Sequence, residues 1–292
     1  MAPLEGLGER LAAGGALTRS EAQQLLETKN LIAVGALADE VRARVNGTDV
    51  TFLRVLDVAA DGPLPPIPGG TGEIRIAGLR PDAPNAEARV REVVSAAGAI
   101  PVTACALHEM TGDLARRLRR AGLSMVATAL VDRLLDTRLV DEVRGAGLDV
   151  ARWAVDSYDP LPPLDLFERV QRLGDLRGFA PLPETIDPAL PTTGYDDVKL
   201  IALARAYLPN VRAVSVDWSR YGPKLAQVAL TFGAADLDGV AAVEPAGANL
   251  LGPRRATIEE VKRNILAAAR RPVPRNAKFE PLETAGAATS SL

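Results

Sequence analysis

The chain is poor in the side chains that bind metals and form cross-links. It has one cysteine, Cys105, and one histidine, His108, among its 292 residues. A single thiol excludes an internal disulfide and any metal site that needs several cysteines. A single histidine excludes a metal site built on a histidine pair. Cys105 lies mid-strand among apolar neighbours, so we expect a small, buried, hydrophobic side chain there.

Long apolar runs are also missing. No run reaches the roughly 18 residues that a membrane helix needs. The N-terminal stretch "MAPLEGLGERLAAGGALTRSEAQQ" carries acids early and has no continuous apolar core, unlike a secretory signal. The net charge of −3 gives no general attraction to nucleic acid or acidic lipid. We therefore expect a cytoplasmic protein without a nucleic-acid or membrane partner.

Lysine is scarce as well, since arginine outnumbers it 29 to 5. The arginines are scattered among acids in helical patterns such as "ARRLRRAGL". This pattern favours solvated helix faces over a phosphate-binding patch.

Apolar segments that suit strands are present and alternate with helical patterns. Several are apolar almost throughout, as parallel strands covered on both sides are. Eight such strands with helices between them predict an α/β fold, a (β/α)8 TIM-type barrel. The predicted strands are residues 50–59, 72–78, 100–107, 123–130, 148–155, 176–182, 211–218 and 237–243.

The first strand–helix unit is degraded. The segment "ADGPLPPIPGGT" between the first two strands has four prolines and three glycines and cannot hold a helix. Before the barrel we predict two helices, "LTRSEAQQLLET" and "NLIAVGALADEVRARVNG". The predicted organisation is a helical extension over residues 1–48, a barrel over 49–275 and a disordered tail over 276–292.

Three segments carry a family resemblance. They are "ALTRSEAQQLLETKNLIAVGALADEVRARVNGTDVTF", then "GEIRIAGLRPDAP", and last the run from "LPTTGYDDVKLIALARAYLPNVRAV" through "YGPKLAQVALTFGAADLDG" to "RRPVPRNAKF". In this order they resemble the radical S-adenosylmethionine enzymes of the futalosine route to menaquinone, such as aminofutalosine synthase and dehypoxanthine futalosine cyclase. The resemblance covers somewhat more than half of the chain. It implies a barrel fold and, for the parental class, a transferase or cyclase of menaquinone biosynthesis.

The chain departs from this family at three motifs. The family carries Cys-x3-Cys-x2-Cys after the first strand, where it holds a [4Fe–4S] cluster that binds S-adenosylmethionine, but this chain reads "LDVAADGPLPPIPGGTGEIRI". The glycine-rich substrate loop after the fourth strand is replaced by "SMVATALVD", and the histidine expected in "VEPAGANLLG" is missing. A cluster takes about three or four thiolates. We therefore expect no cofactor, neither a cluster nor S-adenosylmethionine, no metal, and no radical activity.

Polar residues at the predicted strand ends are the candidate site, because a barrel presents its functional side chains there. His108 and Glu109 follow the third strand and are candidate acid–base catalysts. The alternative is that Glu109 only begins the next helix. The candidate ligand-binding residues, which suit hydrogen bonding and stacking to a ribose or polar ring, are Asp156, Tyr158, Asp217, Trp218, Tyr221 and Glu244. Ordinary polar loop ends are the alternative for this set.

These observations predict a cluster-free, non-radical homologue that serves the pathway as an accessory or nucleoside-binding protein. Two alternatives stay open: a cofactor-independent acid–base enzyme on the same barrel, and a structural subunit that partners a cluster-bearing homologue. The expected partners are a small nucleoside ligand or a futalosine-pathway enzyme. A homodimer is also compatible with the sequence.

Overall fold

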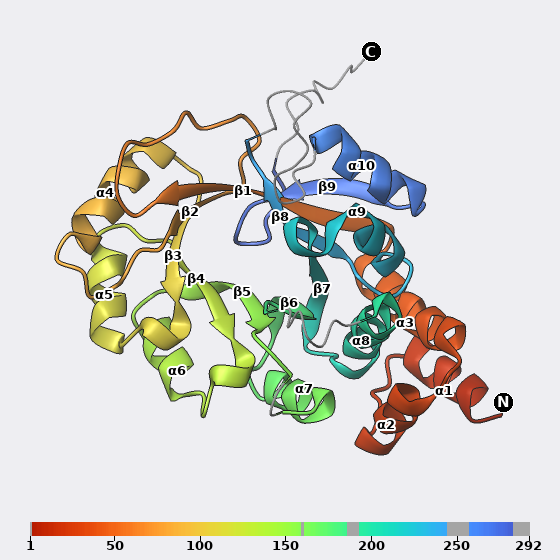
Figure 1. Cartoon of the computed structure of the whole chain (residues 1–292). Helices are drawn as coiled ribbons and strands as arrows, with labels where there is room; N and C mark the ends of the chain where they lie inside the picture. Colours follow the sequence, from red (N-terminus) through yellow and green to blue (C-terminus); the bar gives the residue numbers. More distant parts are fainter. Residues whose placement is uncertain (1, 159–160, 186–192, 244–256, 283–292) are drawn as a thin grey trace, which may run out of the picture.

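Eight parallel strands close into a barrel. The computed structural model describes residues 2–158, 161–185, 193–243 and 257–282. The strands follow one another in chain order around the ring, and β1 pairs with both β2 and β8 to close it (Figure 1). The predicted TIM-type barrel and all eight predicted strands are confirmed. Their bounds are β1 (Asp49–Ala59), β2 (Glu73–Ala77), β3 (Val102–Ala106), β4 (Met125–Leu130), β5 (Asp149–Val155), β6 (Leu176–Pro183), β7 (Val211–Asp217) and β8 (Asp236–Ala241).

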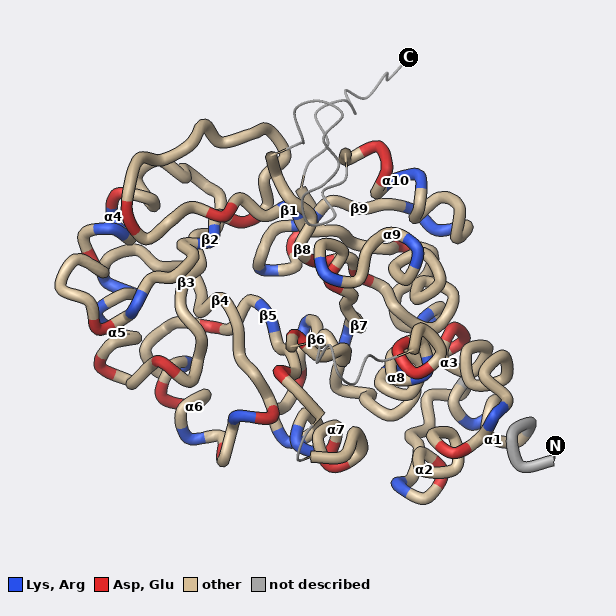
Figure 2. The backbone as a smooth tube through the Cα atoms, in the orientation of Figure 1, with Lys and Arg blue, Asp and Glu red and all other residues tan. Residues whose placement is uncertain are grey.

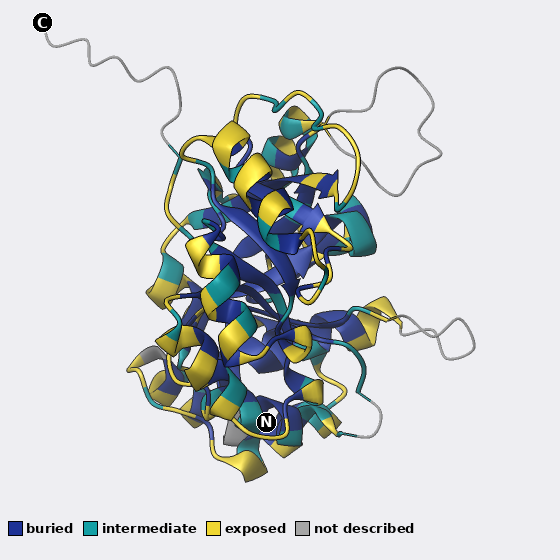
Figure 3. Ribbon diagram, turned by 90° about the vertical axis from the view of Figure 1, so that its left-hand side faces the viewer, coloured by how far each residue is buried: buried dark blue, intermediate teal, exposed yellow. Residues whose placement is uncertain are grey.

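Helices cover the outside of the ring. Their apolar faces lie against the strands, and their outer faces are exposed (Figure 3). The helices are α4 (Ala86–Ala97), α5 (Gly112–Arg120), α6 (Arg138–Gly145), α7 (Pro163–Gln171), α8 (Gly194–Tyr207), α9 (Trp218–Ala229) and α10 (Ile258–Ala267), with short 3-10 turns η1 (Leu107–Glu109) and η2 (Val131–Arg133). No helix in the described ranges is long and apolar enough to cross a membrane.

The connection from β1 to β2 holds no helix in the described structure, as the prolines and glycines predicted. Hydrogen bonds shape it instead. The Arg54 guanidinium donates to the Gly69 carbonyl at 2.6 Å, and the Gly72 amide donates to the Arg54 carbonyl at 2.9 Å. The loop therefore closes the ring without a covering helix.

The N-terminal extension has three helices rather than the predicted two: α1 (Ala2–Ala12), α2 (Arg19–Glu27) and α3 (Leu31–Asn46). Helix α1 was not predicted. This extension lies against α8 on one side of the barrel (Figure 1). Two hydrogen bonds fix it there, from Lys199 Nζ to the Thr28 carbonyl at 2.6 Å and from the Tyr195 hydroxyl to the Lys29 carbonyl at 3.1 Å.

A ninth strand, β9 (Arg271–Arg275), was not predicted. It pairs in parallel with the first half of β1, Asp49–Leu53, whereas β2 pairs with the second half, Val55–Ala59. Pro272 and Pro274 lack the backbone N–H that a central strand uses, which is why the segment does not read as a strand.

Ordered structure continues past Arg275, where the sequence analysis placed a disordered tail. Ala277 is fully buried, and Arg275 forms an isolated bridge with Pro281. The Arg275 guanidinium stacks 3.7 Å from the centre of the Phe279 ring. The chain after β9 therefore folds back over the base of the barrel, the end at which the strands begin.

Candidate functional site

The interior of the barrel is lined by charged side chains that rise from the strands themselves. Figure 2 shows basic and acidic segments together on the strands around the centre of the ring. Two groups of these side chains, which interact electrostatically through Arg75 and Asp238, together form what we call the mouth network, because it reaches the C-terminal ends of the strands. Its members are Glu73 and Arg75 on β2, Thr103 on β3, Arg152 on β5, Glu184 just after β6, Asp217 on β7 and Asp238 on β8.

Arg152 stands at the centre of the mouth network. Its Nε lies 3.0 Å from Asp238 Oδ2, and its Nη2 lies 3.3 Å from Asp217 Oδ2. Its Nη1 makes a third, short ion pair with Glu184. One buried guanidinium thus joins three carboxylates from three neighbouring strands, which fixes all of them in place.

Glu73 anchors the opposite side of the network. One of its oxygens, Oε1, accepts hydrogen bonds from Arg75 Nε at 2.9 Å and from the Thr103 hydroxyl at 2.6 Å. Glu73 is only 1% exposed, so this carboxylate has to be paired inside the protein.

A further ion pair lies in the barrel wall nearer its base. Arg275 of β9 donates to both oxygens of Asp236, at 2.6 and 2.7 Å, and both side chains are buried. The Thr51 hydroxyl donates to the same carboxylate at 2.5 Å.

Burial and charge act in opposite directions on the network. Burial alone would raise the pKa of Asp238, but Arg152, Arg275 and Arg75 together hold that pKa below its usual value of 3.8. Burial would lower the pKa of Arg152, yet Asp238, Glu184 and Asp217 raise it. Both groups therefore stay charged at neutral pH.

The carboxylates of the network outnumber its arginines. Asp57 on β1 adds to this excess, and its carboxyl behaves differently from that of Asp238. Desolvation raises the pKa of Asp57 although much of its side chain is exposed; Glu73 and Asp217 add to the rise, and Arg75 opposes it. The mouth therefore has carboxylate oxygens in contact with solvent, and buried ion pairs lie beneath them.

The predicted acid–base pair lies at the rim. His108 and Glu109 are exposed in η1 after β3. Glu109 Oε2 accepts a hydrogen bond from the Ala106 amide at 2.8 Å, so this carboxylate caps the turn that contains it. Such a contact is structural and needs no catalytic role. Arg133 Nη1 lies 3.5 Å from His108 Nε2.

Arg133 also links the rim to Asp156. Its Nη2 donates to Asp156 Oδ2 at 2.5 Å, and the Thr185 hydroxyl donates to the other oxygen at 2.6 Å. Hydrogen bonds from Thr185 and Arg133 lower the pKa of Asp156, so the carboxylate is charged at neutral pH. Thr185 follows Glu184 directly, which joins this chain of contacts to the mouth network.

Three other predicted residues lie in the wall between these groups. The Tyr158 hydroxyl donates to the Pro181 carbonyl and the Tyr221 hydroxyl to the Pro183 carbonyl, each at 2.6 Å. Burial raises the pKa of both phenols. Trp218 is 1% exposed. Glu244 lies outside the described residues.

Asp217 is the predicted residue most deeply built into the site. Besides its ion pair with Arg152, it caps α9: its Oδ1 accepts from the Arg220 amide at 3.0 Å and from the Ser219 hydroxyl at 2.7 Å. Sequence reasoning missed Glu73, Arg75, Arg152 and Asp238. The signal was present, because charges inside otherwise apolar strands have to be paired when the strands are buried.

Among the described residues, no group of three or more histidine, cysteine, aspartate or glutamate side chains is arranged to hold a metal ion. The Cys105 thiol is buried and donates to the Leu79 carbonyl at 3.3 Å, and burial raises its pKa to about 12. The prediction of a buried cysteine is confirmed.

Comparison with known proteins decides the lineage. The family described as "CofH/MqnC C-terminal region" matches residues 186–288. Aminodeoxyfutalosine synthase of Thermus thermophilus is 36% identical over 132 residues, which is 40% of this chain and 35% of that protein. Over these stretches the chain is similar to the futalosine-pathway enzymes. The predicted family resemblance is confirmed.

A second group of relatives shares shorter stretches. The 5-amino-6-(D-ribitylamino)uracil–L-tyrosine 4-hydroxyphenyl transferase of Archaeoglobus fulgidus is 38% identical over 76 residues, 24% of this chain and 22% of that protein. The chain therefore matches only about a third of the length of aminodeoxyfutalosine synthase and less than a quarter of the length of the transferase.

Solved structures share the fold. Methylornithine synthase (PylB) superposes with a TM-score of 0.69 at 15% identity, over 94% of this chain and 98% of that one. HydG, a maturase of the [FeFe]-hydrogenase, gives a TM-score of 0.66 at 13% identity, over 92% of this chain and 76% of that one. At these identities the likeness concerns the barrel alone.

Proposed function

We propose that this futalosine-pathway relative is a cluster-free, non-radical protein that binds a nucleoside of the pathway at the C-terminal end of its barrel. The observation that carries the proposal is the mouth network, in which Arg152 fixes Glu184, Asp217 and Asp238 in one constellation with an excess of carboxylate oxygens. Fixed acceptors of this kind suit ribose hydroxyls and exocyclic amines, which are hydrogen-bond donors.

The chemistry of the sulfur ligands supports the cluster-free part. A [4Fe–4S] cluster takes about three or four thiolates, and this chain has one cysteine. That cysteine, Cys105, lies on β3, whereas the cluster motif of the family follows the first strand. Its thiol donates a hydrogen bond to the Leu79 carbonyl, and its raised pKa disfavours the thiolate that iron binds. The residues present therefore do not fit the cluster, and no step of the proposed function passes through it.

Thermal denaturation with added ligand tests the binding. The four ligands are aminofutalosine, dehypoxanthine futalosine, S-adenosylmethionine and the enolpyruvyl benzoate precursor. A ligand at about 100 times its Kd adds roughly 2.7 kcal/mol, so the midpoint rises by several degrees for a chain of this size. We expect one of the nucleosides to give this rise and S-adenosylmethionine to give none. Flat curves with all four would refute the nucleoside site and direct the search to a protein partner.

A matched pair of variants locates the site. Asp57→Asn removes a charge at the mouth without changing shape, and we expect about tenfold weaker nucleoside binding, the loss of one charged hydrogen bond. Asp113→Asn makes the same change on the exposed face of α5 and should leave binding unchanged. Equal effects of the two variants would place the ligand elsewhere.

The acid–base alternative has one specific observation in its favour. Asp57, whose pKa is raised by desolvation, and His108, which lies 3.5 Å from Arg133 Nη1, are both exposed at the mouth. If the chain turns over a nucleoside, His108→Ala and Asp57→Asn should each lower kcat, by about 100-fold for a general acid or base. Binding without turnover would leave the binding-protein assignment.

A further inference from the structure

The base of the barrel holds a cavity that the proposed nucleoside site does not use. Its volume is about 400 Å³. We call it the basal cavity and define it by the four side chains that give it its character: Arg177 on β6, Arg212 on β7, and Lys278 and Phe279 on the segment after β9. It lies at the N-terminal ends of the strands, opposite the mouth network.

Two arginines lie side by side in this cavity. Leu176 pairs with Val211 and Gly178 with Ala213, so Arg177 and Arg212 occupy the register position between these pairs. Both are exposed, and neither makes an ion pair with an acidic residue of the described chain. Like charges directly opposite one another on neighbouring strands destabilise a sheet, and a bound anion removes that repulsion.

Lys278 brings a third cation to the same place from a distant part of the sequence. Arg177 Nη1 donates to the Lys278 backbone carbonyl at 2.9 Å, which holds the loop against β6. One N–H of the Arg177 guanidinium is used in this way, and a guanidinium carries five. Within the part of the chain that the structure describes, the other N–H groups of Arg177 make no hydrogen bond, so they can bind a ligand.

The two carboxylates that line the cavity, Asp49 and Glu280, do not cancel this positive charge. Asp49 is already held by Arg271, which donates to both of its oxygens. Glu280 accepts a hydrogen bond from Asn276 Nδ2 at 2.7 Å and is the remaining acid of the lining. Three cations therefore face one uncompensated carboxylate.

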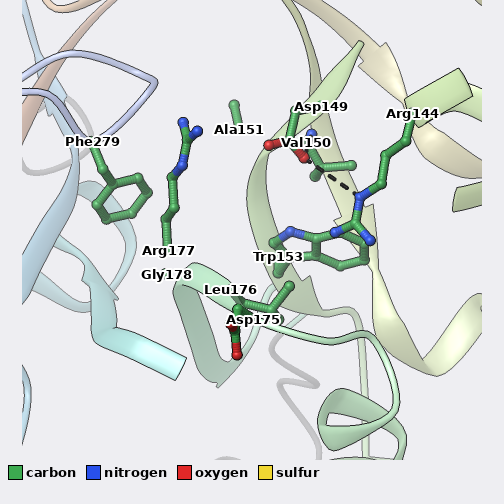
Figure 4. Close-up of a pocket in the computed structure, with 10 residues that line it drawn as sticks. All are labelled: Arg144, Asp149, Val150, Ala151, Trp153, Asp175, Leu176, Arg177, Gly178 and Phe279. Carbon is green, nitrogen blue, oxygen red and sulfur yellow. Dashed lines mark hydrogen bonds and ion pairs between the residues drawn. The ribbon is translucent and has the colours of Figure 1, made fainter. Parts of the chain in front are cut away.

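Phe279 forms the apolar wall and is held in an uncommon conformation. Its φ is 60°, a left-handed value that costs a bulky residue energy and tends to persist at functional positions. Its ring sits over Gly178, where an added side-chain carbon would overlap the ring. Figure 4 shows Arg177 extended beside Phe279, with Trp153 and Arg144 across a neighbouring cavity of about 280 Å³.

We propose that the basal cavity binds the phosphate group of a small phosphate ester. The planar guanidinium groups of Arg177 and Arg212 suit bidentate hydrogen bonds to phosphate oxygens, and the Lys278 ammonium adds a point charge. The volume exceeds what one phosphate fills, so the Phe279 side leaves room for the ester's organic part. This site is at the other end of the barrel from the proposed nucleoside site, so the two assignments can fail separately.

Calorimetric titration of the full chain with phosphate tests the site. Inorganic phosphate and ribose 5-phosphate are compared with ribose and with chloride at matched ionic strength. We expect binding by both phosphates, tighter by the ester, and none by ribose or chloride. Binding of inorganic phosphate alone would make the free anion, not an ester, the ligand and would overturn the ester assignment. No difference between phosphate and chloride would overturn the site itself.

Variants separate this site from general charge effects. Arg177→Gln and Arg212→Gln should each weaken phosphate binding about tenfold, the loss of one charged hydrogen-bonding group. Arg120→Gln, on the exposed end of α5, is the matched control and should change nothing. Arg212→Gln should not lower the melting midpoint without phosphate, because the substitution relieves repulsion. Unchanged phosphate affinity in a folded Arg212→Gln protein would refute the proposal.

Discussion

The two ends of the barrel treat charge in opposite ways. At the mouth, Arg152 lies within ion-pair distance of three carboxylates, and the surplus is acidic. At the base, Arg177 and Arg212 lie side by side, and the surplus is basic. The same parallel strands carry both arrangements, a few residues apart.

The difference concerns what each end does for the fold. Buried charges have to be paired, and removing one partner leaves an uncompensated charge in a medium that solvates it poorly. The mouth network is therefore part of the structure whether or not a ligand binds. The cations at the base are exposed, so water solvates their charges; the fold uses Arg177 through its hydrogen bond to the Lys278 carbonyl rather than through an ion pair. Four substitutions test this contrast.

The largest effect is expected at the centre of the mouth. Arg152→Met keeps the approximate length of the side chain but leaves the carboxylates of Glu184, Asp217 and Asp238 close together without the cation that pairs with them. We expect a loss of about 3–5 kcal/mol in the free energy of unfolding, the usual result of breaking a buried ion pair. Urea denaturation at pH 7 measures it. A loss as small as that of an exposed arginine would show that the network is not structural.

The base should depend on shape rather than charge. Gly178→Ala puts a methyl group against the Phe279 ring, so the ring and its loop have to move. Overpacking of this kind costs about 1–3 kcal/mol. Urea denaturation gives the loss, and crystallography of the variant would show the displaced loop. Gly145→Ala is the control, because an added carbon there meets nothing within 4 Å. Equal stability of the two variants would contradict the packing of Phe279.

Acid should weaken the mouth through Asp238. The folded-state pKa of this carboxyl lies below the unfolded value of 3.8, so its contribution to stability is present above that pH. It is lost as the pH falls through 3.8 toward the folded pKa. Unfolding free energies measured from pH 6 to pH 3 should fall more steeply for the natural protein than for Asp238→Asn. Parallel curves would show that Asp238 is not held charged by its arginines.

The smallest effect is expected where an ion pair is exposed. Arg80 donates to Asp82 through Nε at 3.2 Å and through Nη2 at 2.8 Å, but both side chains lie in water. Arg80→Gln should leave the unfolding midpoint unchanged within error, because exposed pairs contribute little. A loss comparable with that of Arg152→Met would show that burial does not determine how much an ion pair contributes to the stability of this protein.

The strands of the fold were predictable because their signal is local. Each apolar run, such as "VRAVSVDW", carries its own boundary signals, and the glycines after α4, α5 and α6 mark the helix ends. β9 was missed because Pro272 and Pro274 argue against a strand, although prolines are tolerated in a strand at the edge of a sheet such as β9. α1 was missed because "APLEGLGERLA" has two glycines and a proline, although Leu4, Leu7 and Leu11 recur at helical spacing.

The site was predictable only in part, because it depends on which strands become neighbours. Asp217 and Asp156 could be chosen as polar residues at strand ends. Their partners Arg152 and Arg133 could not be assigned to them, because those contacts form only when the barrel closes. The basal arginines were overlooked for another reason. Scattered along the sequence, they resembled solvated charges, and only the register of β6 with β7 brings Arg177 beside Arg212.

The pairing of β9 with β1 has a consequence for how the protein is made. Asp49 and Arg271 are 222 positions apart, yet their strands share one ladder of hydrogen bonds. During synthesis the first half of β1 leaves the ribosome long before its partner exists, with open backbone groups on that side. An open strand edge is a site of aberrant association. The barrel can thus form its ring early, but it remains vulnerable to aggregation until the segment after α10 arrives.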